Sequence, residues 1–428
     1  MGSRQLTVGG NNQTTGVSGV ISDCGPTSNE CGATLANSGG SLIKAGTGTL
    51  TLSGTNTYTG ATQVDDGGLI VDGSIATSSG LTVDAGGTVG GTGTLPTTVI
   101  NGTLAPGNSI GTITVAGNLT FGAGSIYAVE VSPAAADRTN ATGSATLAGI
   151  VQATFASGTY VTRQHTILHA DGGLGGTTFA SLSTVALPAG LAAALSYGTN
   201  DVFLDLTAQL GLDTAGLGGN QQNVAGAINS YFNGGGALPP GFLPLFDLNG
   251  GALSSALSQL SGEATTGAQQ AGAQLTNQFL SLMLDPFAVG RGSTIGGVPG
   301  TGSALALAPE SGLPPEAALA FAKVKKAPPS TAPAAMAPSW SAWGGPFGGT
   351  GKIEGDASTG SSDLRTNTGG FAAGIDYLVA PDTVVGFALA GGVTKWDIAA
   401  GLGGGSSDAF QAGAYAVTRP GRGTSPAL

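Results

Sequence analysis

The sequence predicts a mainly β protein in which a parallel β-helix is followed by a helical linker and by an incomplete antiparallel β-barrel. Three observations predict this order. Short apolar runs recur from Gly46 to Val131 with Gly, Asn, Asp and Ser between them, the apolar spacing becomes helical after Leu210, and longer alternating strands begin at Trp340. We therefore divide the chain into a β-helical region at 1–210, a helical segment at 211–289, a Pro/Ala/Gly-rich linker at 290–338 and a barrel-like region at 339–428.

The composition narrows the class of protein. The chain has 428 residues with 78 glycines, and only 9% of its residues are charged, against about 25% in an average soluble domain. An apolar share of 40% is too high for a typical disordered polymer, so the glycines are expected to serve turns. The net charge is -11, and before residue 291 the basic residues are few and scattered. A nucleic-acid partner is therefore not expected, because no basic surface exists to neutralise phosphates.

The first region reads as very short strands with Gly-rich corners, which favours a solenoid. In a parallel β-helix, one coil cannot bury its apolar face alone, so neighbouring coils stack and share a core. The end of such a stack needs a cap, and the segment from Ser125 to Leu206 could supply it. Its longer strands are expected at Ile126 to Val131, Gly149 to Phe155, Tyr160 to Leu168 and Asp201 to Leu206. An antiparallel sandwich is the structural alternative.

Two helical stripes follow. The first runs from Asn220 to Phe232, and the second from Leu253 to Met283, where Asp285-Pro286 ends it. The opposite face of the second stripe carries Ser, Thr, Gln and Asn with almost no charge. Such a face suits a helix enclosed by protein or by a water-filled lumen, and ordinary packing against the β-region is equally open.

From Trp340 onward the predicted strands are about ten residues long, which suits a tilted membrane-spanning strand. They cover Trp340 to Phe347, Thr368 to Val379, Thr383 to Gly392 and Asp408 to Thr418. One face of the second strand holds Phe371, Ala373, Ile375, Tyr377 and Val379, and the other holds Ala372, Gly374 and Asp376. A transmembrane β-barrel needs this alternation, although a soluble sheet with one buried face would also have it.

No run reaches the ~18 apolar residues of a membrane helix. The N-terminus MGSRQLTVGG lacks the apolar core of a secretory signal, so no signal peptide is expected in this chain. Cys24 and Cys31 lie close together in CGPTSNEC, where Gly25 and Pro26 favour a turn. The preferred prediction is a local disulfide in an oxidising compartment, and the alternative is two free thiols.

The sequence contains no convincing set of catalytic residues, and we expect no cofactor and no metal. His165 and His169 have strand spacing that places them on one face about 13 Å apart, too far for one metal, so we interpret them as ordinary strand histidines. Gly107-Asn108-Ser109-Ile110-Gly111 matches a nucleophile elbow but lacks the helix that must follow it.

The acidic residues of the repeat region could line one edge of a β-helix, as in a polysaccharide lyase or a calcium site. They are Asp65, Asp66, Asp72 and Asp84. Lyase chemistry also needs a basic group, and no Lys or Arg lies between Lys44 and Arg138. Turn-forming aspartates are therefore the preferred interpretation.

Together these segments resemble a known family. GTGTLTLSGTNTYTGAT followed by GGLIVDGSI resembles the passenger-associated repeat of autotransporters, the type V secretion proteins of Gram-negative bacteria. LAPGNSIGTITVAGNLTFGAGSIYAVEV resembles the end of such a passenger and ALSQLSGEATTGAQQ the helical segment before the translocator. WSAWGGPFGG with FAAGIDYLVAPDTVVGFALAGG resembles the first strands of the barrel.

The resemblance implies a β-helical passenger, a helix in the barrel pore and an outer-membrane-type barrel of twelve strands, inserted by the barrel-assembly machinery. From Trp340 to Leu428 only about four or five strands fit. We therefore expect an incomplete barrel from a truncated or frame-shifted reading frame, unable to translocate a passenger by itself.

Two functions follow as expectations. The first is a non-enzymatic autotransporter fragment at the outer membrane or cell surface, with a surface-displayed or adhesin-type passenger whose host or surface ligand is not specified. The alternative is a β-helical enzyme that acts on polysaccharide.

Overall fold

The structure is a computed structural model that describes residues 3–23, 38–212, 216–284, 340–380 and 382–418. The chain forms two compact units, one comprising Met1–Leu217 with Gln221–Leu257 and the other Gly218–Asn220 with Ser258–Leu428. Cys24 and Cys31 lie outside the described residues, so the disulfide stays a prediction.

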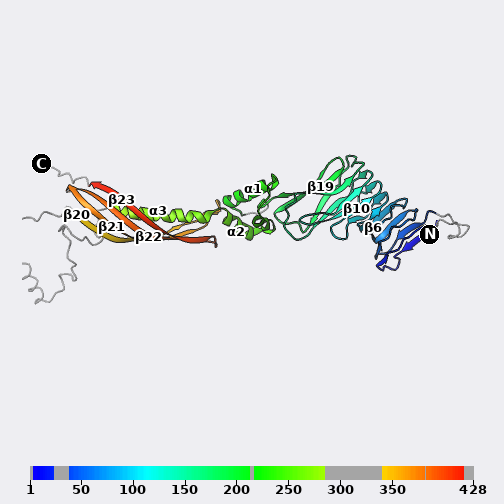
Figure 1. The fold of residues 1–428 in the computed structure, drawn as a ribbon, viewed down its shortest axis with the longest axis horizontal. Helices are drawn as coiled ribbons and strands as arrows, with labels where there is room; N and C mark the ends of the chain where they lie inside the picture. Colours follow the sequence, from blue (N-terminus) through cyan, green and yellow to red (C-terminus); the bar gives the residue numbers. More distant parts are fainter. Residues whose placement is uncertain (1–2, 24–37, 213–215, 285–339, 381, 419–428) are drawn as a thin grey trace, which may run out of the picture. The chain divides into compact units, whose positions relative to one another are not determined.

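The first unit contains the predicted parallel β-helix (Figure 1). Its larger sheet has 13 strands, namely β1 (Gln5–Val8), β2 (Thr15–Val17), β3 (Ser41–Lys44), β4 (Thr49–Leu52), β5 (Thr62–Val71), β6 (Leu81–Gly91), β8 (Thr98–Ile100), β9 (Thr103–Pro106), β11 (Leu119–Phe121), β12 (Ile126–Val131), β14 (Ala145–Thr146), β15 (Ile150–Phe155) and β17 (Ser181–Val185). The second sheet has six strands, namely β7 (Thr94–Leu95), β10 (Thr112–Val115), β13 (Arg138–Ala141), β16 (Gln164–Ala170), β18 (Leu191–Tyr197) and β19 (Asp201–Ala208).

The strand pairing excludes the sandwich alternative. β8, β9 and β10 follow one another along the chain, and β11, β12 and β13 pair with them in parallel, so that each coil lies on the coil before it. In a sandwich of hairpins these neighbours would be antiparallel.

Apolar side chains form a continuous column through the coils. Residues in direct register from β4 to β17 are Leu50, Leu69, Val89, Leu104, Tyr127, Val151 and Leu182. The first six of these side chains are fully or almost fully buried. Each coil therefore completes the core of its neighbours, which explains the short period-two runs in the sequence.

Glycines allow the coils to approach closely at the corners. Gly91 ends β6 with a φ of +104°, and a Cβ atom there would lie 2.3 Å from the carbonyl oxygen of Val71 in the preceding coil. Both the backbone conformation and the contact exclude a side chain at this position.

The predicted cap is shorter than expected. β12, β15 and β17 continue the parallel stack, with β12 paired to β9 on one side and to β15 on the other. Only β19 is antiparallel to both of its neighbours, β16 and β18. The longer strands of this segment are therefore mostly further coils, because their inward residues continue the same apolar column.

Helix α1 (Gly219–Asn233) closes the end of β19 through two asparagine side chains. Asn233 accepts from the backbone N–H of Ala208 (2.7 Å) and donates to its carbonyl (3.0 Å). Asn229 makes the same pair of hydrogen bonds with Leu210, at 2.9 and 3.0 Å. The two amides thus act as a neighbouring strand and satisfy a backbone edge that would otherwise be buried without partners.

The second helical stripe is divided into two helices. A 3-10 helix, η1 (Pro240–Asp247), precedes α2 (Gly250–Leu260), and α3 (Glu263–Leu284) follows after Gly262. Gly262 has a φ of +76°, a left-handed conformation that ends a helix. The regular apolar spacing did not reveal this break. None of the helices in the described ranges is both long and apolar enough to cross a membrane.

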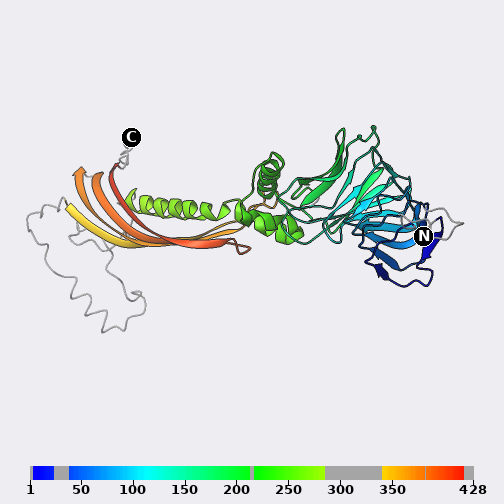
Figure 2. The ribbon, with the colours of Figure 1, turned by 45° about the vertical axis from the view of Figure 1, so that its right-hand side comes forward.

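The second unit contains a four-stranded antiparallel sheet ordered β20 (Trp340–Ile353), β21 (Leu364–Ala380), β22 (Thr383–Ile398) and β23 (Gly403–Thr418). The strands curve around α3, which packs against all four (Figure 2). Within the described residues β20 and β23 do not pair with each other, so the sheet is not closed.

We expect Leu104→Ala to destabilise the β-helix by about 2 to 5 kcal/mol, because Leu104 is fully buried in the apolar column. Hydrogen exchange of the full chain, followed by mass spectrometry, would report this as faster exchange in β9 and in the coils on either side. Thr103→Ala is the matched control on the outward face of the same strand, and equal exchange in the two variants would contradict the column as the source of stability.

Candidate functional site

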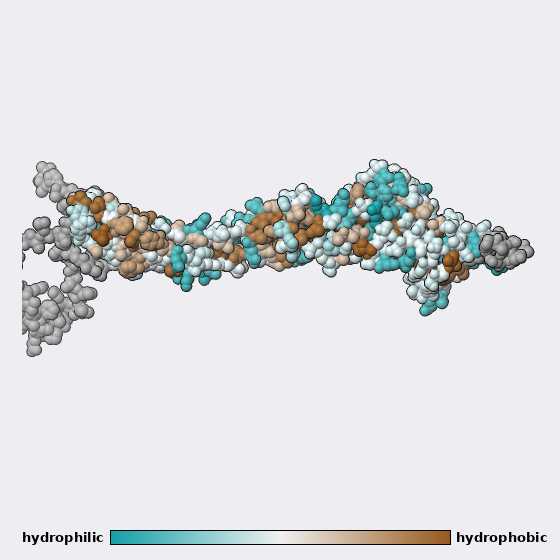
Figure 3. Space-filling model, viewed as in Figure 1, coloured by the Kyte–Doolittle hydropathy of each residue, from teal (hydrophilic) through white to brown (hydrophobic). Residues whose placement is uncertain are grey.

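The two faces of the C-terminal sheet differ in the size and polarity of their side chains. On β21 the face toward α3 carries Ala372, Gly374 and Asp376, as the alternation predicted, and the other face carries exposed Phe371 and Ile375. The exposed large side chains of the outward face are Trp340, Phe371, Ile375, Val379, Phe387, Leu389, Val393 and Phe410. On the face drawn in Figure 3, hydrophobic surface gathers over this sheet, whereas the β-helix is mostly white and teal. The outward face therefore has the apolar character of a lipid-facing sheet.

Uncharged polar side chains of α3 contact the inward face. Gln274 accepts a hydrogen bond from the Thr366 hydroxyl (2.5 Å) and Gln278 accepts one from the Thr368 hydroxyl (2.9 Å). On β23, Gln411 donates to the Thr276 hydroxyl at 2.9 Å. These three contacts between α3 and the strands are all made by uncharged groups, and they place part of the uncharged polar face of the helix against the sheet.

Glycines in the helix and the strands let α3 approach the sheet. A Cβ atom on Gly267 would lie 2.2 Å from Cδ1 of Trp396. On the strands, the same atom would lie 3.1 Å from Leu275 at Gly392 and 2.6 Å from the sulfur of Met283 at Gly413. Because the residues of the inward face are small, they leave the volume that the helix occupies.

The loop between β20 and β21 holds the start of α3. The carboxylate of Glu263, the first residue of α3, accepts a hydrogen bond from the backbone N–H of Ser362 at 2.6 Å. An acidic side chain in the first turn also interacts favourably with the helix dipole. This contact holds the N-terminus of α3 at the end of the sheet where the loop joins β20 to β21.

A buried polar cluster joins three strands on the inward face. The Trp343 indole N–H lies 3.1 Å from both Asp376 Oδ1 and the Tyr415 hydroxyl, and Tyr415 also donates to Asp376. All three side chains are less than 10% exposed. The alternation along β21 predicts Asp376 on the small-residue face, but its partners Trp343 and Tyr415 are distant along the chain and leave no local pattern.

In the β-helix, the structure does not place His165 and His169 on one face as predicted. The pairing of β16 with β19 shifts at Ile167, between Thr166 and Leu168. Such a β-bulge adds a residue and reverses the side on which later residues point. His165 is consequently buried, whereas His169 lies at the surface.

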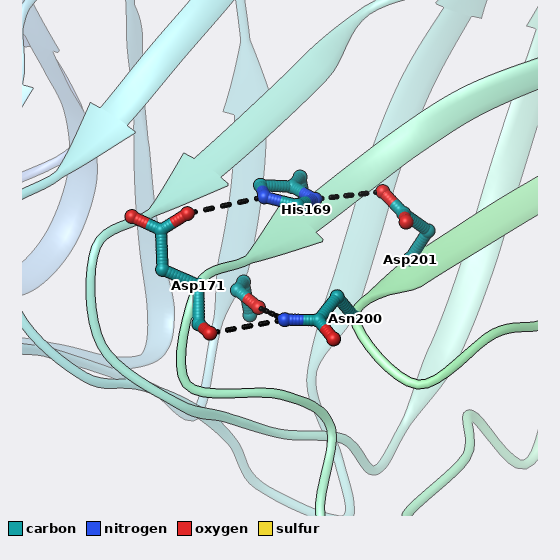
Figure 4. Close-up of polar contacts among 5 residues, drawn as sticks. His169, Asp171, Asn200 and Asp201 are labelled. Atoms are coloured by element: carbon teal, nitrogen blue, oxygen red, sulfur yellow. Dashed lines mark hydrogen bonds and ion pairs between the residues drawn. The ribbon is translucent and has the colours of Figure 1, made fainter.

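His169 lies between two carboxylates (Figure 4). Its Nδ1 is 2.8 Å from Asp201 and its Nε2 is 3.1 Å from Asp171. Asn200 supports this end of the strand by donating to the carbonyls of Ala170 and Asp171 at 2.7 and 3.0 Å. Since both neighbours accept, the doubly protonated ring is favoured, and the hydrogen bond to Asp201 is the main reason that the pKa of His169 is raised. Burial lowers the pKa of His165.

The four aspartates each lie near a corner or a turn and do not form a cluster. Asp66 accepts from the N–H of Gly67 (2.8 Å), Asp84 from Gln63 (3.0 Å) and Asp72 from Asn108 (2.7 Å). Asp65 falls where the register of β5 with β6 shifts. Across the described ranges, no group of three or more His, Cys, Asp or Glu residues could hold a metal ion.

The Ser109 motif does not form a nucleophile elbow. It lies in the loop between β9 and β10, and a strand follows it where an elbow requires a helix. The loop is held by Asp137, which accepts from the N–H groups of Gly111 and Glu130, both at 2.8 Å. Burial raises the pKa of this carboxyl to about 6. Its role is to fix the loop.

The geometry is that of a parallel β-helix followed in the chain by an antiparallel sheet with one exposed apolar face and a helix along its inward face. Two family models match the chain, the passenger-associated transport repeat at residues 42–71 and the autotransporter β-domain at residues 342–425. A search of curated proteins finds none that matches. The two matches support an autotransporter with a passenger and a C-terminal translocator domain, a family that implies the outer membrane or the cell surface.

The pKa values of the two histidines are expected to lie on opposite sides of the ordinary value of about 6.5, that of His169 above it and that of His165 below it. Because the pKa of His169 is raised, its contribution to stability is complete below about pH 6.5 and is lost as the pH rises through the raised value. His165 removes stability as the pH falls below about 6.5, since only the unfolded chain then takes up the proton. NMR of the ring protons would measure both, and Asp201→Asn should lower the pKa of His169 alone. An unchanged His169 titration in that variant would show that Asp201 is not the cause.

Gly267→Ala and Gly272→Ala make the same change on α3 with opposite expected results. A methyl group on Gly267 must displace Trp396, whereas no atom lies within 4 Å of the Cβ position at Gly272. We expect Gly272→Ala to stabilise the helix by up to about 1 kcal/mol and Gly267→Ala to destabilise the helix–sheet contact. Tryptophan fluorescence during urea unfolding in detergent micelles would measure both, and equal midpoints would contradict the close approach.

Proposed function

We propose that this chain carries a non-enzymatic passenger of the surface-displayed or adhesin type, joined to an incomplete translocator that the barrel-assembly machinery would insert into the outer membrane once the barrel is complete. The observation that carries the proposal is the position of α3, which packs along the small-residue face of strands whose other face is apolar and exposed. In a closed barrel this inward face lines the lumen, and α3 would be the segment that passes through it.

The connecting loops indicate the orientation of the strands. β20 joins β21 through residues 354–363, and β22 joins β23 through residues 399–402, both at the same end of the sheet. At the opposite end, β21 and β22 are joined through residues 381–382 alone. Outer-membrane barrels have short periplasmic turns and longer extracellular loops, so the end at which α3 begins is assigned to the exterior.

Insertion requires more strands than the four that the structure describes. The N–H and C=O groups of an open sheet edge have no partners in hydrocarbon, and only a closed barrel avoids this cost. β20 and β23 are the two edges of the described sheet. A complete translocator must therefore bring further strands to both edges, and folding factors at the membrane would protect the edges until closure.

The contacts of two residues, Lys44 and His169, support a passenger without catalytic function. Lys44, the basic residue nearest the aspartates, is fully buried and donates to the carbonyls of Ala45, Gly46 and Asp66 at 2.9, 2.7 and 3.1 Å. It is therefore closed off from any substrate. Both ring nitrogens of His169 are engaged by carboxylates, which leaves neither as a base.

Surface display is tested by expressing the chain in a Gram-negative host with an export signal and with further barrel strands fused to its C-terminus, so that the sheet can close, and by treating intact cells with protease. We expect the passenger to be digested and α3 to be protected by the translocator. Adhesion of cells to a solid surface should fall after the same treatment. Retention of an undigested passenger in the periplasm would contradict display by this chain.

The alternative, a polysaccharide-acting enzyme, is tested separately with the purified full chain. The proposal expects no cleavage of acidic polysaccharides with or without calcium. Cleavage that Asp65→Ala or Asp84→Ala abolishes, while Asp205→Ala does not, would replace the proposed function with the enzymatic one.

A further inference from the structure

At one end of the C-terminal sheet the outward face carries polar and charged side chains, which contact with lipid tails does not account for. A groove of about 990 Å³ lies there, across all four strands. Its charged lining residues are Lys352, Arg365, Lys395 and Asp397. Thr350, Asn367 and Ser406 add two hydroxyl groups and an amide. The groove is therefore rich in groups that bind phosphate and sugar oxygens.

Strand register places these groups on the outward face in two neighbouring rows. Arg365 is paired with Lys352 on one side and Asp397 on the other. In the next outward row, Asn367 is paired with Thr350 and with Lys395, which is itself paired with Ser406. Two residues farther along β22 is Val393, one of the exposed apolar side chains. The rows thus lie directly at the edge of the apolar band.

Positive charge dominates among these groups. Lys352 lies 3.2 Å from Glu354 and 3.5 Å from Asp363, exposed ion pairs of small energetic value. In the part of the chain that the structure describes, Arg365 and Lys395 have no ion-pair partner within 4 Å. Asp397 is the one carboxylate that lines the groove, and Asp408 lies in the adjacent row of β23. Two cations are therefore available to an anionic group.

The position of these two rows of residues on the sheet indicates which kind of molecule would bind in the groove. They lie at the end of the sheet with the longer loops, which the proposed function assigns to the exterior, so this step rests on that function. At the opposite end, Trp340 and Tyr377 pack together on the outward face with ring centroids 4.7 Å apart, as in an aromatic girdle. An outward groove at the exterior edge of the apolar band faces the headgroups of the outer leaflet.

We propose that this groove binds the phosphorylated sugar headgroup of an outer-leaflet glycolipid, with Arg365 and Lys395 on its phosphates. Arg365 offers a planar fork for phosphate oxygens and Lys395 a point charge. Thr350, Asn367 and Ser406 supply hydrogen bonds to sugar hydroxyls. The acyl chains of the same lipid would lie along the apolar rows below the groove.

Native mass spectrometry of the full chain in a neutral detergent tests the proposal. The probe is the acylated bisphosphorylated diglucosamine lipid of lipopolysaccharide, compared with its dephosphorylated form. We expect the bisphosphorylated lipid to bind at least tenfold more tightly. Each of Arg365→Gln and Lys395→Gln should weaken its binding by about fivefold, and the double variant by about 25-fold. Asp397→Asn, which removes a competing negative charge, should strengthen it.

Arg4→Gln is the matched control, because it removes one exposed cation from the passenger and should leave lipid binding unchanged. Equal binding of the two lipids, or variants of Arg365 and Lys395 that bind like the parent, would overturn the proposal. Because the assay needs no export, it is independent of the protease experiment on intact cells. The groove variants should still be displayed, so loss of display and loss of lipid binding report different failures.

Discussion

The translocator domain depends on the difference in side-chain size between the two faces of one sheet. Glycine and alanine on the inward face leave the volume that α3 fills, as the contacts at Gly392 and Gly413 show. Large apolar side chains on the outward face, such as Phe371 and Phe387, would be costly in water and stable in lipid. The same alternation therefore creates both the contact with the helix and the contact with the membrane. A shift of one residue in strand register would exchange the two faces and remove both.

The passenger is stabilised by a different device, a column of apolar residues that no single coil can complete. Its two ends are consequently the sites where stability must be added. At one end β19, which is antiparallel to both β16 and β18, stops the stack, and Asn233 and Asn229 of α1 bond the backbone of Ala208 and Leu210 at and just after the end of β19, where the pairing with β16 has ended. Loss of these amides would leave buried backbone groups unsatisfied and expose the final coil to fraying. The cap is thus built partly from a helix, which periodicity alone did not indicate.

Sequence reasoning succeeded where one periodicity holds over a long segment. The period-two runs predicted the β-helix, and the alternation around Ile375 predicted both faces of the C-terminal sheet. It was wrong where a single residue interrupts the period: the bulge at Ile167 separates His165 from His169, and Gly262 divides the second helical stripe. Contacts between distant residues, such as Asp376 with Trp343 and Tyr415, leave no local signal, because each residue alone fits an ordinary strand.

Charge is used sparingly in this chain, so the place of each cation is informative. Lys44 is buried among carbonyl oxygens, and Arg163 donates to the carbonyl of Phe232 near the C-terminal end of α1, where the helix dipole favours a positive charge. These two cations serve the fold. Arg365 and Lys395 instead lie exposed beside the apolar band. The free-energy cost of a charge on the lipid-facing side is small near the membrane interface and large in the hydrocarbon core. Their position therefore limits how deeply the strands can enter the bilayer, and the limit is most effective when a phosphate group holds both cations at the surface.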